Sequence, residues 1–404
     1  MDMRTLRFAL LPWIALALAG VASLAWLGLL GFAWNDYDVE AAPAFAALVR
    51  GDAADFLALC PAYGGSLIMR APFALAAGGM GGGEVAVFRA VGLPCLLAGA
   101  ALGVVLAASL LARGAGRGAV ATVVCLCAAN PITLRALDLG HPEELLGAAL
   151  CAGAVLAGVR GRATLAGLLL GLAVANKAWA LLAVGPVLLA LDGDRRRALA
   201  LAGGVAAAFT VPLLLAGSAS GHAGAAAQTG AIFQPWQVWW FLGSPDAVIR
   251  GGDGLVKEGY RQAPAWLSAF SHPLIVGVAV PLSALAARRR ADPLLLLSLL
   301  FLLRCVLDPW NNTYYVLPCV LALAAWEPLR HRRPPLLTLA TVVATFITME
   351  RIFDVAPLDV VAASYLAWSL PLAGFLAWRL YAPALGSMPA LSSGGRASVW
   401  STTQ

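Results

Sequence analysis

Three carboxylates lie close together where the first long apolar run of the chain ends. Asp36, Asp38 and Glu40 directly follow the run Leu6–Phe32. A carboxylate that apolar neighbours partly remove from water is suited to act as a general base. A solvated loop that caps a helix would have the same composition, so this alternative stays open. The cluster makes Asp36, Asp38 and Glu40 candidate catalytic residues.

Three cations farther along the chain are candidates for binding a phosphate. A Gly-rich turn after Tyr63 leads into an apolar segment that carries Arg70, and a helix N-terminus with an arginine suits an anion. Lys177 interrupts a long apolar stretch, and Arg304 lies inside another. Each has a structural alternative: Arg70 and Lys177 could extend to the lipid headgroups, and Arg304 could pair with Asp308 four residues on.

A polar segment, Asn130–Glu144, separates two further apolar runs and contains His141 beside Glu143. Its residue types are those that a sugar-phosphate site needs, so His141 joins the candidate phosphate ligands. The candidate sugar- or lipid-binding residues are aromatic or amide side chains near apolar segments: Tyr63, Trp236, Trp239, Trp240 and Asn311. Tryptophans at a membrane interface also serve as ordinary anchors. No histidine or cysteine spacing predicts zinc, and the acidic cluster is too sparse for a calcium loop, so we expect neither metal nor cofactor.

The composition indicates which kind of element positions these side chains. Apolar residues make up 61% of the 404 residues and charged residues 12%, against about 45–50% and 25% in soluble domains. The run Leu6–Phe32 exceeds the roughly 20 residues that cross a bilayer and is too long for a typical signal peptide. The sequence predicts an all-α polytopic bundle of about 12 transmembrane helices. The predicted segments are Leu6–Phe32, Val91–Ala112, Ala119–Ala136, Leu145–Val159, Ala163–Ala175, Ala178–Leu191, Ala198–Ala216, Pro273–Ala287, Pro293–Leu307, Tyr314–Trp326, Pro335–Thr348 and Leu358–Tyr381.

Basic residues fall in short clusters at every second break between these segments, which predicts cytoplasmic N- and C-termini. This spacing, rather than one basic face, argues against nucleic acid as a partner despite the net charge of +6. The long segments Ala33–Arg89 and Gly217–His272 then lie outside, the first with surface helices at Ala41–Val49 and Gly65–Ala77. We expect one transmembrane domain over residues 1–383 and a disordered cytoplasmic tail over 384–404.

Taken together, these stretches resemble the GT-C superfamily of membrane glycosyltransferases, and most closely glycosyltransferase family 87. The resemblance covers most of the chain in outline. It is carried by the acidic cluster with Gly51-Asp52 and Pro61-Ala-Tyr63-Gly after it, by Gly167-Leu-Leu-Leu-Gly-Leu-Ala-Val-Ala-Asn-Lys177, and by Asp308-Pro-Trp-Asn-Asn followed by aromatics. The sequence departs from the family in one place, since Pro-Ala-Tyr-Gly stands where Tyr-Pro-Pro is frequent.

The resemblance implies a GT-C-like bundle, a polyprenyl-phosphate sugar as donor, with mannose as the sugar, and inversion at the anomeric carbon. It also implies an aspartate base in the first loop, which corresponds best to Asp36, with Asp38 as the neighbouring alternative. The expected partners are this donor, a lipid or glycan acceptor and membrane lipids, at the extracytoplasmic face of the cell membrane.

Two other functions share some of these features. A transporter or flippase of lipid-linked glycans would also need polar residues within the membrane, but such proteins often contain inverted repeats and polar sites at the midplane. Here the polar residues gather near one surface, and no repeat is evident in the sequence. A ligase or polymerase that acts on lipid-linked oligosaccharides would look the same at this level.

Overall fold

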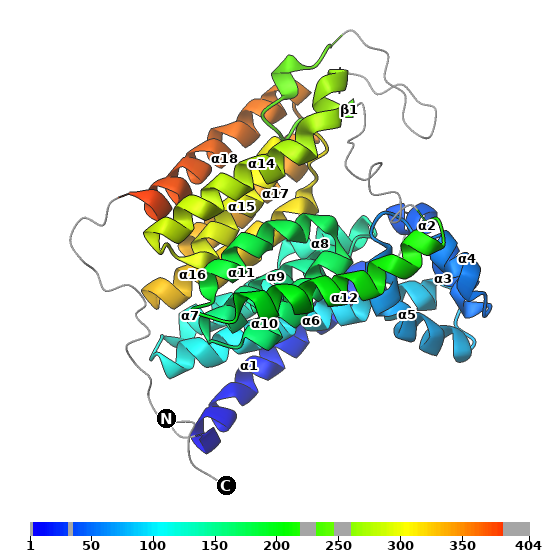
Figure 1. Ribbon diagram of the computed structural model, residues 1–404, viewed down its shortest axis with the longest axis horizontal. Coiled ribbons are helices and arrows are strands. Elements are labelled where there is room, and N and C mark those ends of the chain that lie inside the picture. Colours follow the sequence, from blue (N-terminus) through cyan, green and yellow to red (C-terminus); the bar gives the residue numbers. More distant parts are fainter. Residues whose placement is uncertain (1–2, 31–34, 219–231, 246–259, 383–404) are drawn as a thin grey trace.

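The computed structural model describes residues 3–30, 35–218, 232–245 and 260–382. In these ranges the chain is almost entirely helical (Figure 1). The α-helices are α1 (Met3–Leu24), α2 (Asp36–Glu40), α3 (Ala42–Val49), α4 (Ala53–Ala58), α5 (Gly64–Gly79), α6 (Glu84–Ala112), α7 (Arg117–Ala128), α8 (Pro131–Asp138), α9 (Glu143–Val159), α10 (Ala163–Asn176), α11 (Val184–Ala190), α12 (Arg195–Leu215), α14 (Ala265–Arg289), α15 (Pro293–Leu307), α16 (Leu317–His331), α17 (Leu336–Phe346) and α18 (Leu358–Tyr381).

Short irregular turns join some of these helices. They are the π-helical turns η1 (Ala25–Leu29) and η5 (Ile347–Ile352) and the 3-10 turns η2 (Ala178–Ala183), η3 (Trp240–Leu242) and η4 (Thr313–Val316). The sequence analysis did not predict the two-residue strands β1 (Ile232–Phe233) and β2 (Arg261–Gln262), which pair antiparallel. They lie in the second long outer segment, where hydrogen bonds from Gln234 and Val238 to the carbonyls of Pro309 and Val306 attach the chain to the end of α15.

Six helical stretches among the described residues are long and apolar enough to cross a membrane. They are Phe8–Leu29, Glu84–Ala112, Arg117–Asp138, Arg195–Leu215, Ala269–Arg289 and Leu358–Tyr381. The predicted all-α membrane protein is therefore confirmed, while the count of about 12 crossings stays a prediction. The remaining predicted segments correspond to shorter apolar helices packed among these six.

The largest differences from the predicted helix starts occur at α6 and α14, and they shorten both of the long segments that were predicted to lie outside. The helix α6 starts at Glu84 rather than Val91, and α14 starts at Ala265 rather than Pro273. In α6 the charged residue Arg89 does not end the helix, because its guanidinium donates hydrogen bonds to the carbonyls of Leu29 and Leu30 at the end of the first helix. Carbonyls at the end of a helix generally lack a partner within the helix, and the arginine supplies donors to these two.

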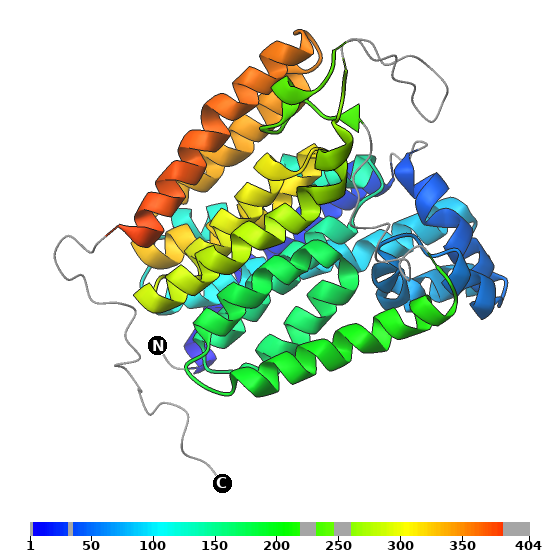
Figure 2. The same ribbon diagram turned by 45° about the horizontal axis from the view of Figure 1, so that its top comes forward.

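Small residues allow the central helices to pack closely, as is common between membrane helices. Gly167 and Gly171 of α10 face α12, and a Cβ on Gly167 would approach the carbonyl oxygen of Ala198 to 2.5 Å. The same contacts show that α10 and α12 run in the same direction. Figure 2 shows α12 along one edge of the bundle, where its end reaches α4 and α5, while α18 lies at the opposite edge.

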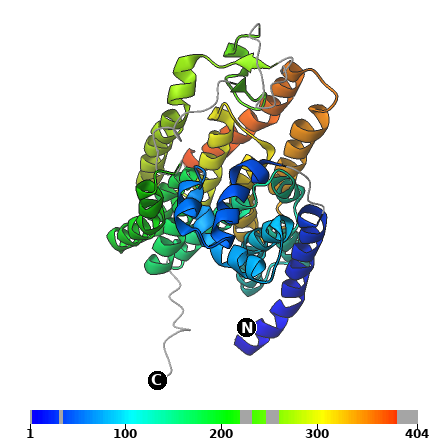
Figure 3. The ribbon, with the colours of Figure 1, turned by 90° about the vertical axis from the view of Figure 1, so that its right-hand side faces the viewer.

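The helices α2 to α5 gather at one end of the bundle, as Figure 3 shows. Helices are present at both places where surface helices were predicted, since α3 and α5 match Ala41–Val49 and Gly65–Ala77 closely. The helix α5 packs against α6, α10 and α12. This end of the molecule also holds the turns that follow α8, α10 and α15, so it brings together polar residues from distant parts of the sequence.

Candidate active site

The turn between α8 and α9 fixes the position of Asp36. Gly140 in this turn has a positive φ of 84°, and a Cβ there would meet the backbone nitrogen of Tyr37 at 2.5 Å. Only glycine therefore allows the turn to lie against the start of α2. The Asn35 side chain adds a second contact between the turn and α2, because its amide donates a hydrogen bond to the carbonyl of Asp138. As a result Asp36, the first residue of α2, lies beside His141, with 3.3 Å between Oδ2 and Nε2.

The three carboxylates of the acidic cluster have different surroundings. Asp38 accepts a hydrogen bond from the backbone nitrogen of Asn35 and completes a capping box at the start of α2. Glu40 accepts a hydrogen bond of 2.7 Å from the Tyr63 hydroxyl. The Asp36 side chain contacts the buried His141 and is also 49% exposed. Of the three carboxylates it is therefore the one that contacts His141 by a hydrogen bond and remains open to an acceptor.

His141 connects Asp36 to the interior of the protein. Its Nδ1 lies 2.9 Å from Oε1 of Glu143, and its ring stacks on Tyr314 with 4.7 Å between centroids. Burial lowers the pKa of His141, but the Glu143 carboxylate and the hydrogen bonds to Asp36 and Glu143 outweigh burial and raise the pKa to about 9. At neutral pH the imidazolium can therefore donate one N–H to each carboxylate.

This arrangement predicts an alkaline limit on activity. The raised pKa means that the His141 charge stabilises the folded state fully below pH 6.5, and that this contribution is lost as the pH rises through about 9. We expect the transfer rate to fall over the same range, because a neutral imidazole donates only one hydrogen bond and releases one carboxylate. A pH–rate profile would measure the effect. In the His141→Gln variant the fall in rate near pH 9 should disappear. If the fall persists unchanged, a group other than His141 causes it.

A buried network of charges lies behind His141. The fully buried carboxylates of Glu143 and Glu144 lie 3.0 and 2.9 Å from the Lys177 ammonium. The Arg70 guanidinium approaches Glu143 to 3.5 Å, and that of Arg304 approaches Glu144 to 4.0 Å. With His141 protonated, four cations surround two buried carboxylates. The buried part of the network therefore holds more cations than carboxylates, and the half-exposed Asp36 and Glu40 at its edge balance the total charge. A cation-rich interior of this kind favours binding of an anion.

Two expectations about these cations need correction. The alternative role for Lys177, extension to the lipid headgroups, is not what the structure shows, because Lys177 pairs with two glutamates that α9 contributes. The suggested pair of Arg304 with Asp308 is also absent from the ion pairs of the described residues. The helix α15 ends at Leu307, so Asp308 turns toward His272, 3.6 Å away, and Arg304 stacks over the Tyr315 ring at 4.2 Å.

The structure brings most of the candidate site residues into one cluster. Direct contacts connect Asp36, Glu40, Tyr63, Arg70, His141, Lys177 and Arg304 through Glu143 and Glu144. The Lys177 ammonium lies 4.6 Å from the centre of the Tyr63 ring, so the tyrosine forms a wall beside the lysine. Trp34, which precedes the acidic cluster in the sequence, lies outside the described residues.

The candidate tryptophans and Asn311 form a separate group around the end of α15. Asn311 is buried and donates to the carbonyl of Trp236, whose ring packs on Phe353. Trp240 is fully buried and donates to Asp359. Trp239 is half-buried and donates to the carbonyl of Leu307. Among the described residues, no direct hydrogen bond or ring contact joins this group to His141 or Lys177.

The sequence analysis missed several residues of the cluster. Glu144 and Trp179 were not singled out, although the Trp179 indole donates to Glu144 and covers Arg304 on one side. Tyr314 was noted only as an aromatic after the Asp308 motif, yet it stacks on His141. Glu350 binds the Thr313 hydroxyl and Arg135 and so holds the turn that carries Tyr314. For Glu350 the available signal was its position two residues after the predicted apolar segment Pro335–Thr348.

One subset of the cluster could in principle hold a divalent cation. Asp36, Glu40 and His141 each offer a ligand atom within 4.8 Å of the others. Both nitrogens of His141 face carboxylates, so a divalent cation would take the place of the proton that His141 shares with Asp36.

Comparison with known sequences identifies the family of this chain. A sequence model of glycosyltransferase family 87 matches residues 65–309, more than half of the 404 residues. The chain belongs to glycosyltransferase family 87. No curated protein that was compared with the chain matches it. As a family 87 member the protein is a glycosyltransferase, which confirms the resemblance deduced from its motifs.

The family 87 match contains most of the charge network but not the acidic cluster. Arg70, Lys177, Arg304 and both glutamates of α9 lie inside residues 65–309, whereas Asp36 and Glu40 precede the match. The assignment of a base therefore depends on geometry: Asp36 is the exposed carboxylate that contacts the part of the site covered by the family match.

Proposed function

We propose that this family 87 protein is an inverting glycosyltransferase that moves a hexose, namely mannose, from a polyprenyl-phosphate donor to a lipid or glycan acceptor. The single observation that carries the proposal is the placement of the half-exposed Asp36 carboxylate against a buried group of cations that includes Lys177 and Arg304. A base and an anion site side by side are the two features that transfer from a lipid phosphate needs.

In the proposed reaction the acceptor hydroxyl attacks the anomeric carbon while the bond from that carbon to the phosphate oxygen breaks. Asp36 takes the proton of the hydroxyl, and the lipid leaves as a phosphate monoester that carries one more negative charge than the donor. Lys177 and Arg304 stabilise this charge. His141 orients Asp36, and Arg70 holds Glu143 in place, so both act through their neighbours.

The remaining candidates have more limited roles in this proposal. The Tyr63 ring and the half-buried Trp239 supply apolar faces for the sugar or the prenyl chain. Trp236, Trp240 and Asn311 are buried, so they support the segment that carries Trp239. We propose that the reaction needs neither a metal nor a cofactor, because the cations of the protein itself can balance the leaving phosphate.

The proposed orientation places the active site at the extracytoplasmic face and both chain ends in the cytoplasm, on the basis of the basic clusters. Asp52, an exposed residue between α3 and α4, provides a test. A cysteine introduced there should react with a membrane-impermeant maleimide added outside intact cells. Labelling only after the membrane is made permeable would reverse the orientation.

The function itself is tested with purified protein and radiolabelled donors. Polyprenyl-phosphate mannose together with a membrane extract as acceptor source should give a labelled product, whereas a nucleotide-linked mannose should not. Chelation of divalent metals should leave the rate unchanged. Product from the nucleotide sugar alone would overturn the donor assignment, and loss of activity on chelation, restored by one added metal, would overturn the metal-independent mechanism.

A further inference from the structure

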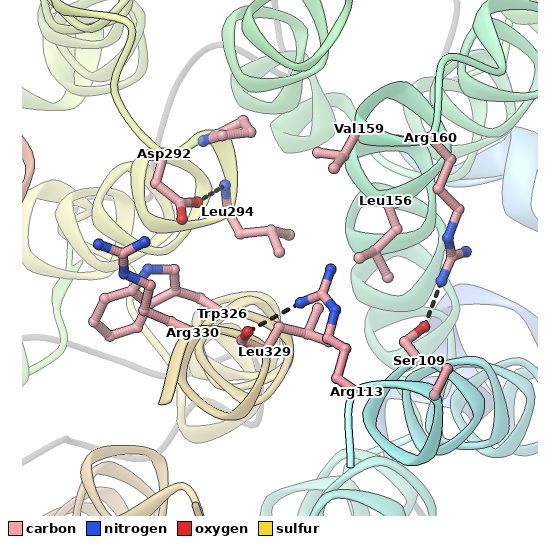
Figure 4. A pocket seen from close by; sticks show the side chains of 12 residues that line it. Ser109, Arg113, Leu156, Val159, Arg160, Asp292, Leu294, Trp326, Leu329 and Arg330 are labelled. Atoms are coloured by element: carbon pink, nitrogen blue, oxygen red, sulfur yellow. Dashed lines mark hydrogen bonds between the residues drawn. The ribbon is translucent and has the colours of Figure 1, made fainter. Parts of the chain in front are cut away.

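A pocket of about 260 Å³ opens at the ends of four helices, α6, α9, α15 and α16, and the last three of these also lead to the active site. Figure 4 shows the side chains that line it, including Arg113 after α6, Arg160 after α9, Arg330 near the end of α16 and Asp292 before α15. Apolar side chains form the rest of the wall, among them Leu156 and Leu294. Neither the proposed reaction nor the family match gives this pocket a role.

The pocket and the active site lie at opposite ends of the same helices. The helix α9 begins with Glu143 and Glu144 and ends next to Arg160, and its 17 residues extend about 25 Å. The helix α15 starts after Asp292 and carries Arg304 near its other end. The helix α16 follows the turn of Tyr314 and ends beside Arg330. The pocket therefore faces the leaflet opposite the one that would supply the donor.

None of the three arginines of the pocket forms an ion pair among the described residues, although Arg330 lies close enough to Asp292 to interact with it electrostatically. Arg113 donates to the carbonyl of Leu329 at 2.9 Å, and Arg160 donates to the Ser109 hydroxyl. Both partners are neutral, and no ion pair of the described residues includes Arg113, Arg160 or Arg330. Like charges gathered in one place repel each other, so this arrangement favours an anion between them.

The one carboxylate in the wall does not neutralise the arginines. Asp292 caps α15, and its Oδ1 accepts hydrogen bonds from the backbone nitrogens of Leu294 and Leu295 at 2.9 and 3.2 Å. A carboxylate that caps a helix start is held by that role. Even with Asp292 counted in full, the pocket keeps a formal charge of +2 from three arginines and one aspartate.

We propose that this pocket binds the phosphate of an anionic phospholipid headgroup. Guanidinium groups from three helices suit a phosphate because each can donate several hydrogen bonds to its oxygens. The apolar wall beside them gives the first part of the acyl chains a surface to contact. Basic pockets between transmembrane helices are known to bind anionic headgroups. A bound lipid would tie the ends of α6, α9 and α16 together.

The test compares two triple variants of the purified, detergent-extracted protein by native mass spectrometry. The first, Arg113→Gln/Arg160→Gln/Arg330→Gln, removes the pocket arginines. The control is Arg196→Gln/Arg197→Gln/Arg288→Gln. It removes three exposed arginines at the same end of the bundle, two from the start of α12 and one from the end of α14. The probes are phosphatidylglycerol, phosphatidylcholine with identical acyl chains, and inorganic phosphate.

Wild-type protein and the control variant should retain phosphatidylglycerol in preference to phosphatidylcholine, and the pocket variant should bind it about 100-fold more weakly. Equal losses in both triple variants would show a diffuse surface effect and overturn the proposal. Displacement of the lipid by millimolar inorganic phosphate would assign the pocket to a soluble phosphate instead. If the triple variant does not fold, the double variant Arg160→Gln/Arg330→Gln replaces it, because it changes only exposed side chains. Its affinity for phosphatidylglycerol should fall about 25-fold.

Discussion

Replacing Asp36 with asparagine should lower the rate of sugar transfer by about 10²- to 10⁴-fold. Asparagine keeps the size of the side chain and can still accept a hydrogen bond from His141, but it cannot take the proton of the acceptor hydroxyl. Because Asp36 is half-exposed, the substitution should change the melting temperature little. A radiolabel transfer assay at saturating donor measures the rate, and retention of donor by the variant shows that the phosphate site is intact.

The neighbouring carboxylates provide matched controls for Asp36. Asp38→Asn removes the acceptor of the capping box at the start of α2, which should cost about 1 kcal/mol of stability and leave the rate within a few-fold of wild type. Glu40→Gln removes the carboxylate that receives the Tyr63 hydroxyl and should have an intermediate effect. If Asp38→Asn abolishes transfer while Asp36→Asn does not, Asp38 is the base. Near-normal turnover in all three variants would disprove the mechanism.

Replacing Lys177 with methionine should have the second largest effect, because the lysine balances two buried carboxylates. Removing one partner of a buried ion pair typically costs about 3–5 kcal/mol of stability. Glu143 and Glu144 would then lie in the interior with less compensation. We expect a lower melting temperature and a marked rise in the KM for the donor. The melting curve and the donor titration measure these two effects separately.

A compensating variant distinguishes the structural from the functional role of Lys177. In Lys177→Met/Glu144→Gln one negative charge disappears together with the positive one, so most of the lost stability should return. If Lys177 binds the donor phosphate, the KM for the donor stays high in this double variant although the fold is restored. Recovery of wild-type KM together with stability would mean that Lys177 only balances the glutamates.

The sequence allowed the membrane class and the outline of the site to be predicted, because both follow from local patterns. Apolar runs mark helices, and each polar residue at the end of such a run is a candidate for the site. Asp36, His141, Lys177 and Arg304 were selected on this basis. The structure shows that these four residues, more than 260 positions apart at the extremes, belong to one contact network.

The pairing between these residues could not be predicted, because it depends on how the ends of the helices meet. The partners of Lys177 come from α9, and the position of the α8–α9 turn against α2 depends on Gly140, whose role is visible only in three dimensions. For the same reason the sequence offered Asp308 as the alternative partner of Arg304 and gave no sign of Glu144. Periodicity identifies which side chains share a face of one helix, but it carries no information on contacts between helices.

The difference in length between α10 and α12 determines the depth at which the enzyme works. Both helices start at the same end of the bundle, with Gly167 beside Ala198, but α10 ends after 14 residues and α12 continues for 21. At 1.5 Å per residue, Lys177 at the end of α10 lies about 10 Å below the level that α12 reaches. The proposed phosphate site therefore lies well below the end of a helix that is long enough to cross a membrane. A donor anchored in the membrane by its lipid can approach such a site from within the bilayer, whereas a water-soluble sugar nucleotide would have to give up much of its hydration to reach it.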